Sequence, residues 1–273
     1  MKNEVFCFQR FWTYFKYDLK QMWRNHARPA IFIGGMGLIV YVIWVLLGLL
    51  FSGGVWHGPG LAARITVFVV AFTVLELYQT RTYGYLTDQR KGSTWLMVPA
   101  STTEKFISML LITLVVIPVL FLVVFFGIDA ILALADPTVG DSIFITALGG
   151  FQTLLENLPI TTNGIFITPT GGTLIFVTIV SVVTNFLYFL LCGICFKRYK
   201  ILGGIATIFL FSIVLSIFTA FTLPAWSENL VMLEDTEAAR MVINTFRWTM
   251  AISILLGILF GVGIFYRLKT IKH

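Results

Sequence analysis

Long apolar stretches alternate along the chain with short segments that hold most of its charged residues. About twenty consecutive apolar residues make a helix long enough to cross the roughly 30 Å of hydrocarbon in a bilayer. The first stretch of this length, residues 31–51, contains no charged side chain. The whole pattern predicts six membrane-spanning helices, at residues 31–51, 65–85, 106–134, 174–196, 201–221 and 248–266.

Composition favours a membrane protein over a soluble one. Apolar residues make up 58% of the chain and charged residues only 12%, whereas roughly a quarter of the residues of a soluble domain are charged. The segments between the predicted spans are too short for a soluble catalytic domain. The predicted fold class is an all-α membrane protein, in which residues 1–30 form a cytoplasmic helix and residues 31–273 form the transmembrane domain.

Positive charge is distributed unevenly around the predicted spans. Of the 19 Lys and Arg residues, all except Arg64, Arg240 and Arg247 fall at one end of the spans: before the first, around the connection 86–105, at 197–200 or after the last. Short cytoplasmic connections carry such an excess. The bias predicts that both termini are cytoplasmic, and it assigns the net charge of +6 to the membrane surface rather than to nucleic acid.

The segment before the first span has the pattern of an amphipathic helix. Between residues 8 and 23 apolar side chains recur at helical spacing, while basic residues such as Lys16 and Lys20 fall largely on other faces. Such a helix lies along a membrane, with basic side chains against anionic lipid headgroups. It either anchors the first span or acts as a lever that passes motion from a cytoplasmic partner. The apolar residues of this predicted interfacial helix are Phe8, Phe11, Trp12, Phe15, Leu19 and Trp23.

The connection 86–105 combines a helix start signal with an apolar cluster. Ser101 followed by Glu104 is a capping box, which predicts a helix that begins at about Thr102. Before it, residues 93–98 are predicted to form one helical turn that carries a run of large apolar side chains. An exposed cluster of this kind among charged residues either anchors the loop in the membrane interface through Trp95 or docks onto a soluble partner.

Two polar residues fall inside predicted spans. Placing a polar side chain in a membrane costs free energy, so such residues are functional candidates. Glu76 lies in the second span, and either an ion pair with a basic residue such as Arg81 or a role in gating accounts for it. Asn185 in the fourth span is expected to form a hydrogen bond to another helix. Asp129 lies near the outer end of the third span, where hydration is expected to make its charge inexpensive.

The sequence offers little for catalysis or metal binding. Its histidines, at positions 26, 57 and 273, lie in distant segments, and Cys192 and Cys195 have no further His or Cys ligand nearby. Motifs typical of metalloproteases and of hydrolases with a nucleophile elbow do not occur, nor does a phosphate-binding loop. We therefore expect no enzymatic activity, and no cofactor, in this chain.

Two outer connections are long enough to hold structure of their own. In the first, about 136–173, residues 143–158 are predicted to form a short helix at the membrane interface that ends before Pro159. In the second, about 223–247, residues 226–240 are predicted to form an amphipathic segment.

One connection resembles a known family. Lys91-Gly92-Ser93, then Val98-Pro99-Ala100-Ser101 and Glu104-Lys105 are similar to the loop between the second and third helices of permease subunits of type-2 ABC exporters, with Val98 where Leu is usual. The Pro-Ala-Ser-x-x-Glu-Lys version resembles permeases of Bacteroidetes-type bacteria. The basic amphipathic N-terminal helix and six predicted spans with both ends inside are also similar to this family.

The resemblance implies a role for each of these segments. Residues 8–23 would be the connecting helix, and the chain would pair with a second copy or a homologue in a bacterial inner membrane. ATP and Mg²⁺ would be bound by a separate ATPase subunit. A membrane scaffold whose loop binds another cytoplasmic partner is the alternative, and no residue pattern selects a substrate. The residues implied to seat on the ATPase are Arg90, Lys91, Gly92, Ser93, Trp95, Leu96, Met97, Pro99, Ser101, Glu104 and Lys105.

Overall fold

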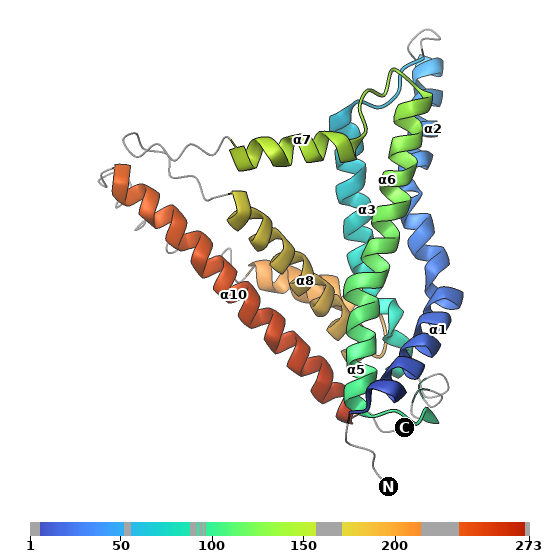
Figure 1. Cartoon of the computed structure of the whole chain (residues 1–273), viewed down its shortest axis with the longest axis vertical. Helices are drawn as coiled ribbons and strands as arrows, with labels where there is room; N and C mark the ends of the chain where they lie inside the picture. Colours follow the sequence, from blue (N-terminus) through green and yellow to red (C-terminus); the bar gives the residue numbers. More distant parts are fainter. Residues whose placement is uncertain are drawn as a thin grey trace.

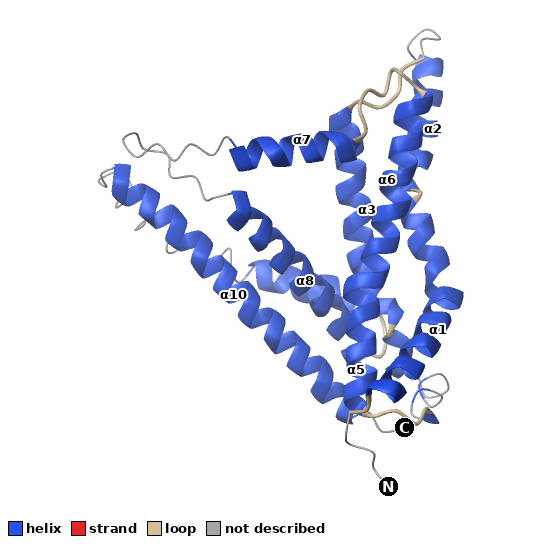
Figure 2. Cartoon of the chain, viewed as in Figure 1, coloured by secondary structure: helices blue, strands red, loops and turns tan. Residues whose placement is uncertain are grey.

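The computed structural model describes residues 6–51, 56–87, 92, 95, 97–156, 171–213 and 235–270. Every regular element within these ranges is helical, and loops connect the helices (Figure 2). The elements are α1 (Phe8–Gly34), α2 (Met36–Phe51), α3 (Leu61–Thr82), the short 3₁₀-helix η1 (Gly84–Thr87), α5 (Thr102–Leu111), the π-helical segment η2 (Ile112–Val116), α6 (Ile117–Ala135), α7 (Ile143–Glu156), α8 (Gly171–Cys195), a helix at Lys200–Ile213 and α10 (Asp235–Thr270).

Five helical stretches are long and apolar enough to cross a membrane. They are Ala27–Phe51, Leu61–Thr87, Thr102–Ala135, Ile175–Cys195 and Arg247–Thr270. The chain is therefore an all-α protein with the helices of a multi-pass membrane protein. The predicted fifth span is represented by the shorter helix Lys200–Ile213, and its remainder, residues 214–221, lies outside the described residues.

The predicted boundary at residue 30, between the interfacial helix and the first span, is not a break in the helix. α1 runs through Pro29 to Gly34, and the helical path is interrupted at Gly35 before α2 begins. Packing explains the continuity, because Ala30 and Ile33 are buried in the core. At Gly34 an added Cβ would lie 3.0 Å from Val124 Cγ1, so a small residue lets α1 approach α6 closely here.

The third span starts where the capping box predicts. Glu104 N donates to Ser101 Oγ, and Ser101 N donates to Glu104 Oε2, so α5 begins at Thr102. The helix then continues through the π-helical turn η2 into α6. A π-helical turn inserts an extra residue and is common near functional sites.

The helices form two groups that lean apart (Figure 1). α1, α2, α3 and α6 stand side by side, whereas α8 and α10 pack against each other and tilt away from them. An aromatic cluster joins the groups, because Phe72 of α3 packs edge-on against Phe186 of α8 and also contacts Phe121 of α6. Around these rings lies a core of buried side chains drawn from α1, α3, α6, α8 and α10.

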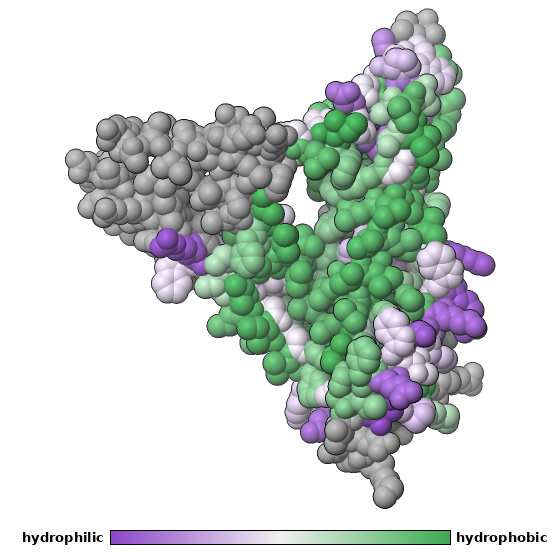
Figure 3. All heavy atoms as spheres, viewed as in Figure 1, coloured by the Kyte–Doolittle hydropathy of each residue, from purple (hydrophilic) through white to green (hydrophobic). Residues whose placement is uncertain are grey.

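The outer surface of the helices is apolar. Large side chains such as Leu50 on α2, Val123 on α6 and Leu255 on α10 are exposed. Figure 3 shows apolar side chains over most of the described part of the visible face, with hydrophilic side chains gathered over α1 near one end. Such a surface suits contact with lipid, since hydrocarbon is no worse a neighbour for these groups than a protein core.

Two outer segments differ in how well they match the predictions. α7 occupies Ile143–Glu156, within the helix predicted at 143–158, and extends sideways from the upper part of α3 and α6 in Figure 1. Residues 157–170 and 214–234 lie outside the described residues. Of the predicted amphipathic segment at 226–240, residues 235–240 belong to α10, one continuous helix from Asp235 to Thr270 that includes the last span, and the rest lies outside the described residues.

Candidate functional site

The first turn of α1, the start of α5 and the last turn of α10 lie at the same end of the molecule, which we call the basal end (Figure 1). The predicted ATPase-coupling residues belong to the connection that crosses this end. Arg90, Lys91, Ser93 and Leu96 lie outside the described residues. Gly92, Trp95, Met97, Pro99, Ser101, Glu104 and Lys105 are described.

Glu104 joins the N-terminal ends of two helices. Besides its bonds within the capping box, the carboxylate accepts hydrogen bonds from Arg10 Nη2 at 2.6 Å and from the backbone N of Cys7 at 2.9 Å. The Glu104 side chain is fully buried, whereas that of Arg10 is 25% exposed. The start of α1 is therefore fixed to the start of α5 through one carboxylate, a link that only the tertiary structure reveals.

Trp95 is clamped between α1 and α5. The Lys105 ammonium donates to the Trp95 carbonyl oxygen at 2.8 Å and lies 4.4 Å from the centre of the indole ring. The Tyr14 side chain of α1 also lies close enough to the Trp95 side chain for the two to interact. Desolvation lets these charged and polar contacts contribute more than they would at the surface.

The expectation that Trp95 belongs to an exposed apolar cluster is wrong. Its exposed fraction is 8%, and it belongs to the hydrophobic core. Met97, two residues later, is 80% exposed, and Pro99 is also exposed. Trp95 therefore holds the connection against the bundle, and among the described residues of this stretch Met97 is the large apolar side chain that is exposed.

Asp18 is a buried acid at the basal end that the sequence analysis did not single out. Its Oδ2 accepts hydrogen bonds from Ser108 Oγ at 2.7 Å and from the Tyr83 hydroxyl at 2.9 Å. Burial raises the pKa of Asp18 above its usual value, and the two hydrogen bonds oppose that shift. The sequence feature that could have identified Asp18 is that it is an acidic residue among the basic residues of an amphipathic helix.

We call the contacts around Glu104, Trp95 and Asp18 the basal junction. Through them α1 is bonded to α5, to the end of α3 and to the connection between them. A further hydrogen bond joins η1 to the start of the helix Lys200–Ile213, because the Lys200 ammonium donates to the Gly84 carbonyl oxygen. These contacts hold the connection 86–105 against α1 and the third span.

The predicted interfacial residues of α1 divide into two sets. Phe11 is buried, and Phe15 and Leu19 pack against the core. Phe8, Trp12 and Trp23 remain exposed, with exposed fractions of 70%, 47% and 59%. Part of the apolar stripe of α1 therefore packs against the protein core. The exposed aromatic side chains are the ones available to contact a membrane interface.

The two intramembrane polar candidates contact each other. Asn185 of α8 lies close enough to the Glu76 carboxyl of α3 for the two side chains to interact, and the expected hydrogen bond between these helices stays a prediction. Arg81, the suggested partner of Glu76, is exposed. One turn below Glu76, the Gln79 side chain is completely buried and its Nε2 has no hydrogen-bond partner.

The opposite end holds a second polar cluster that fixes the outer connections. Arg64 forms a buried ion pair with Asp129, and Asp136 accepts hydrogen bonds from the Tyr41 hydroxyl and Trp56 Nε1. The expectation that Asp129 is hydrated is therefore wrong. The Arg64–Asp129 pair joins α3 to α6, so this cluster holds the two helices together.

Within the described residues, no three His, Cys, Asp or Glu side chains come close enough together to hold a metal ion. In the basal junction the carboxylates accept hydrogen bonds from hydroxyl and guanidinium groups, and the Lys105 ammonium donates to a backbone carbonyl, an arrangement suited to mechanical connection. Comparison with family models, with curated proteins and with solved structures gave no match for this chain.

Proposed function

We propose that this chain is the permease subunit of a type-2 ABC exporter, which moves a substrate across a bacterial inner membrane with ATP hydrolysed on a separate subunit. The observation that carries the proposal is the basal connection itself. Trp95 is clamped to Tyr14 and Lys105, while Met97 is 80% exposed beside it. A connection that is held against the bundle and exposes one large apolar side chain is suited to bind the ATPase subunit.

The contacts of the basal junction would transmit a movement of the connection 86–105 to α1 and α5. A displacement of the connection pulls on Lys105 through the Trp95 carbonyl, and Lys105 belongs to the same helix as Glu104. Glu104 in turn is bonded to Arg10 at the start of α1. Contacts of this kind couple two helices because neither can move alone without breaking charge-assisted hydrogen bonds.

We also propose six spans with both termini in the cytoplasm. α1 starts and α10 ends at the basal end, which supports an even number of crossings. α8 runs toward the basal end and α10 begins away from it, and the apolar helix Lys200–Ile213 lies between them along the chain, where the proposed fifth span falls. The basic residues concentrated near the basal end support its placement in the cytoplasm.

The proposal is tested by purifying the tagged protein from native membranes in polymer discs that keep its lipids and partners. A copurifying subunit with vanadate-sensitive ATP hydrolysis is the expected result. In the Met97→Asn variant we expect recovery of that activity to fall about tenfold, equivalent to about 1.4 kcal/mol, because the variant removes one exposed apolar anchor.

Tyr199→Asn provides the matched control. Tyr199 is 78% exposed in another connection near the basal end, and its φ of 51° is a conformation that Asn adopts readily. We expect this variant to recover the ATPase fully. If the protein purifies without any ATP-hydrolysing subunit, but with another cytoplasmic protein bound to the same connection, the permease assignment is wrong. The chain would then be assigned as a membrane scaffold.

A further inference from the structure

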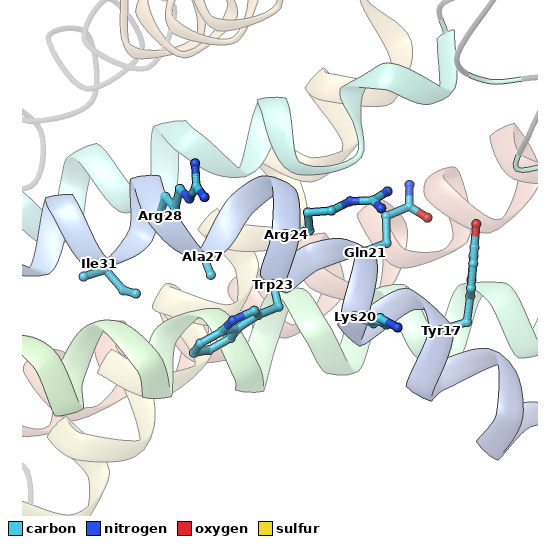
Figure 4. A pocket seen from close by; sticks show the side chains of 8 residues that line it. All are labelled: Tyr17, Lys20, Gln21, Trp23, Arg24, Ala27, Arg28 and Ile31. Carbon is cyan, nitrogen blue, oxygen red and sulfur yellow. The ribbon is translucent and has the colours of Figure 1, made fainter.

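A groove with a volume of about 560 Å³ runs beside α1 (Figure 4). Three basic residues follow it at intervals of four, Lys20, Arg24 and Arg28. Residues four apart lie on one face of a helix, and the outer two are about 12 Å apart along the axis. The remaining described lining residues are Tyr17, Gln21, Trp23, Ala27 and Ile31.

The positive charge of this groove is not neutralised by the described part of the protein. The ion pairs in that part involve Arg10 and Arg64, and neither lines the groove. Asp18, the acid closest in sequence, is buried and bonded to Ser108 and Tyr83. Three cations in a concave surface whose described lining holds no carboxylate create a positive potential that favours an anion.

The groove also extends into the first membrane span. Its basic residues Lys20 and Arg24 precede the apolar stretch that starts at Ala27, whereas Ile31 lies one turn inside it. Figure 4 shows the guanidinium groups of Arg24 and Arg28 at one edge of the helix and Trp23 and Ile31 at the other. The edge with the guanidinium groups therefore matches a charged lipid headgroup, and the edge with Trp23 and Ile31 matches an acyl chain.

We propose that this groove binds an anionic phospholipid, with its phosphate held by Lys20, Arg24 and Arg28 and an acyl chain along Trp23 and Ile31. An acidic surface of a soluble protein would satisfy the cations, but it could not follow the groove to Ile31 within the hydrocarbon. Long basic side chains near the end of a span reach to the headgroup level, where Trp also prefers to lie. Lipid bound here would steady α1 beside the basal junction.

The test uses the purified full chain in a non-ionic detergent, titrated with phosphatidylglycerol or phosphatidylcholine and read by native mass spectrometry. We expect the wild-type protein to prefer phosphatidylglycerol at least tenfold. In Arg24→Gln/Arg28→Gln the affinity for phosphatidylglycerol is expected to fall about 25-fold, at about fivefold per lost charge, while the affinity for phosphatidylcholine stays unchanged.

Lys197→Gln/Arg198→Gln is the control, because it removes the same charge from exposed residues in another connection. We expect it to keep the preference for phosphatidylglycerol. Equal affinity in the wild type and the groove variant, equal losses in groove variant and control, or displacement of the lipid by millimolar inorganic phosphate would overturn the proposal. The assay requires no ATPase, so its outcome is independent of the permease assignment.

Discussion

Arg64 of α3 and Asp129 of α6 form an ion pair with a distance of 2.9 Å between Nη1 and Oδ1, although both side chains are less than 10% exposed. The pair does not stand alone. Arg64 Nη2 donates to the carbonyl oxygens of Val139 and Asp141, and Asp129 accepts from the backbone N of Ile143. These bonds fix the chain between α6 and α7 against the outer end of α3.

Removal of either partner of this pair is expected to be costly. Arg64→Met or Asp129→Leu leaves the other charge buried and unpaired, which costs about 3–5 kcal/mol of unfolding free energy. The double variant should lose less than the sum of the two single losses, since it leaves no unpaired charge from this pair. Reversible unfolding of the purified protein in mixed micelles measures all three values, and strict additivity would contradict a direct interaction.

Asp18 is expected to make the stability of the protein depend on pH. Burial raises the pKa of this carboxyl, so the folded state binds its proton more tightly than the unfolded chain does. The stability of the wild type relative to Asp18→Asn should therefore increase as pH falls from the raised pKa toward the ordinary value of 3.8. Unfolding of both proteins between pH 7 and pH 4 measures this difference, and a constant difference would rule out the prediction.

Asp18→Ala separates the hydrogen bonds from the charge. Asn at this position still offers an oxygen to Tyr83 and Ser108, whereas Ala leaves both hydroxyl groups without their acceptor. At pH 7 we expect Asp18→Ala to be less stable than Asp18→Asn by about 1–3 kcal/mol. The same unfolding assay provides the comparison.

Lys105→Met is expected to loosen the connection at Trp95. The variant keeps most of the side-chain volume, but it removes both the hydrogen bond to the Trp95 carbonyl and the contact between ammonium and indole. We expect hydrogen exchange at the Trp95 amide to become at least tenfold faster, equivalent to about 1.4 kcal/mol.

Lys16→Met is the matched control for that experiment. Lys16 also lies over a tryptophan, with its ammonium 5.4 Å from the centre of the Trp12 ring, but both residues are exposed. Exposed contacts of this kind contribute little. Exchange at Trp95 should therefore be unchanged, and a similar acceleration in both variants would show that the buried contact has no special role.

Gly193→Ala is expected to separate α3 from α8. The backbone of Gly193 lies against the Thr80 carbonyl oxygen, and an added Cβ would overlap that oxygen. Overpacking against a backbone atom costs about 1–3 kcal/mol. Gly127→Ala on α6 is the control, because a Cβ there meets no atom within 4 Å. Thermal unfolding should show a loss for the first variant and no loss for the second.

Local features of this protein were predictable from the sequence because their causes are local. The capping box at Ser101 and Glu104 fixes the start of α5 through bonds between residues three apart, and the structure confirms it. The apolar run at 31–51 likewise lies within a helical stretch, which is interrupted only at Gly35, since its composition alone favours helix. The short helix α7 was predictable for the same reason.

Contacts between distant segments were not predictable in this way. The sequence marks Trp95 as apolar, but its burial depends on Tyr14 and Lys105 approaching it from two helices. The sequence likewise places Asp129 near a span end without showing that Arg64 lies opposite. The six-span topology and the coupling role of the connection stay predictions, because they concern the membrane and a partner.

The sequence by itself determined that this chain forms apolar helices of membrane-spanning length, because helix formation depends on neighbours along the chain. Only the tertiary structure decided which polar side chains are paired and which apolar ones are covered. Those outcomes depend on how helices from distant parts of the chain pack, and one sequence carries the periodicity of each helix but not the identity of its neighbours.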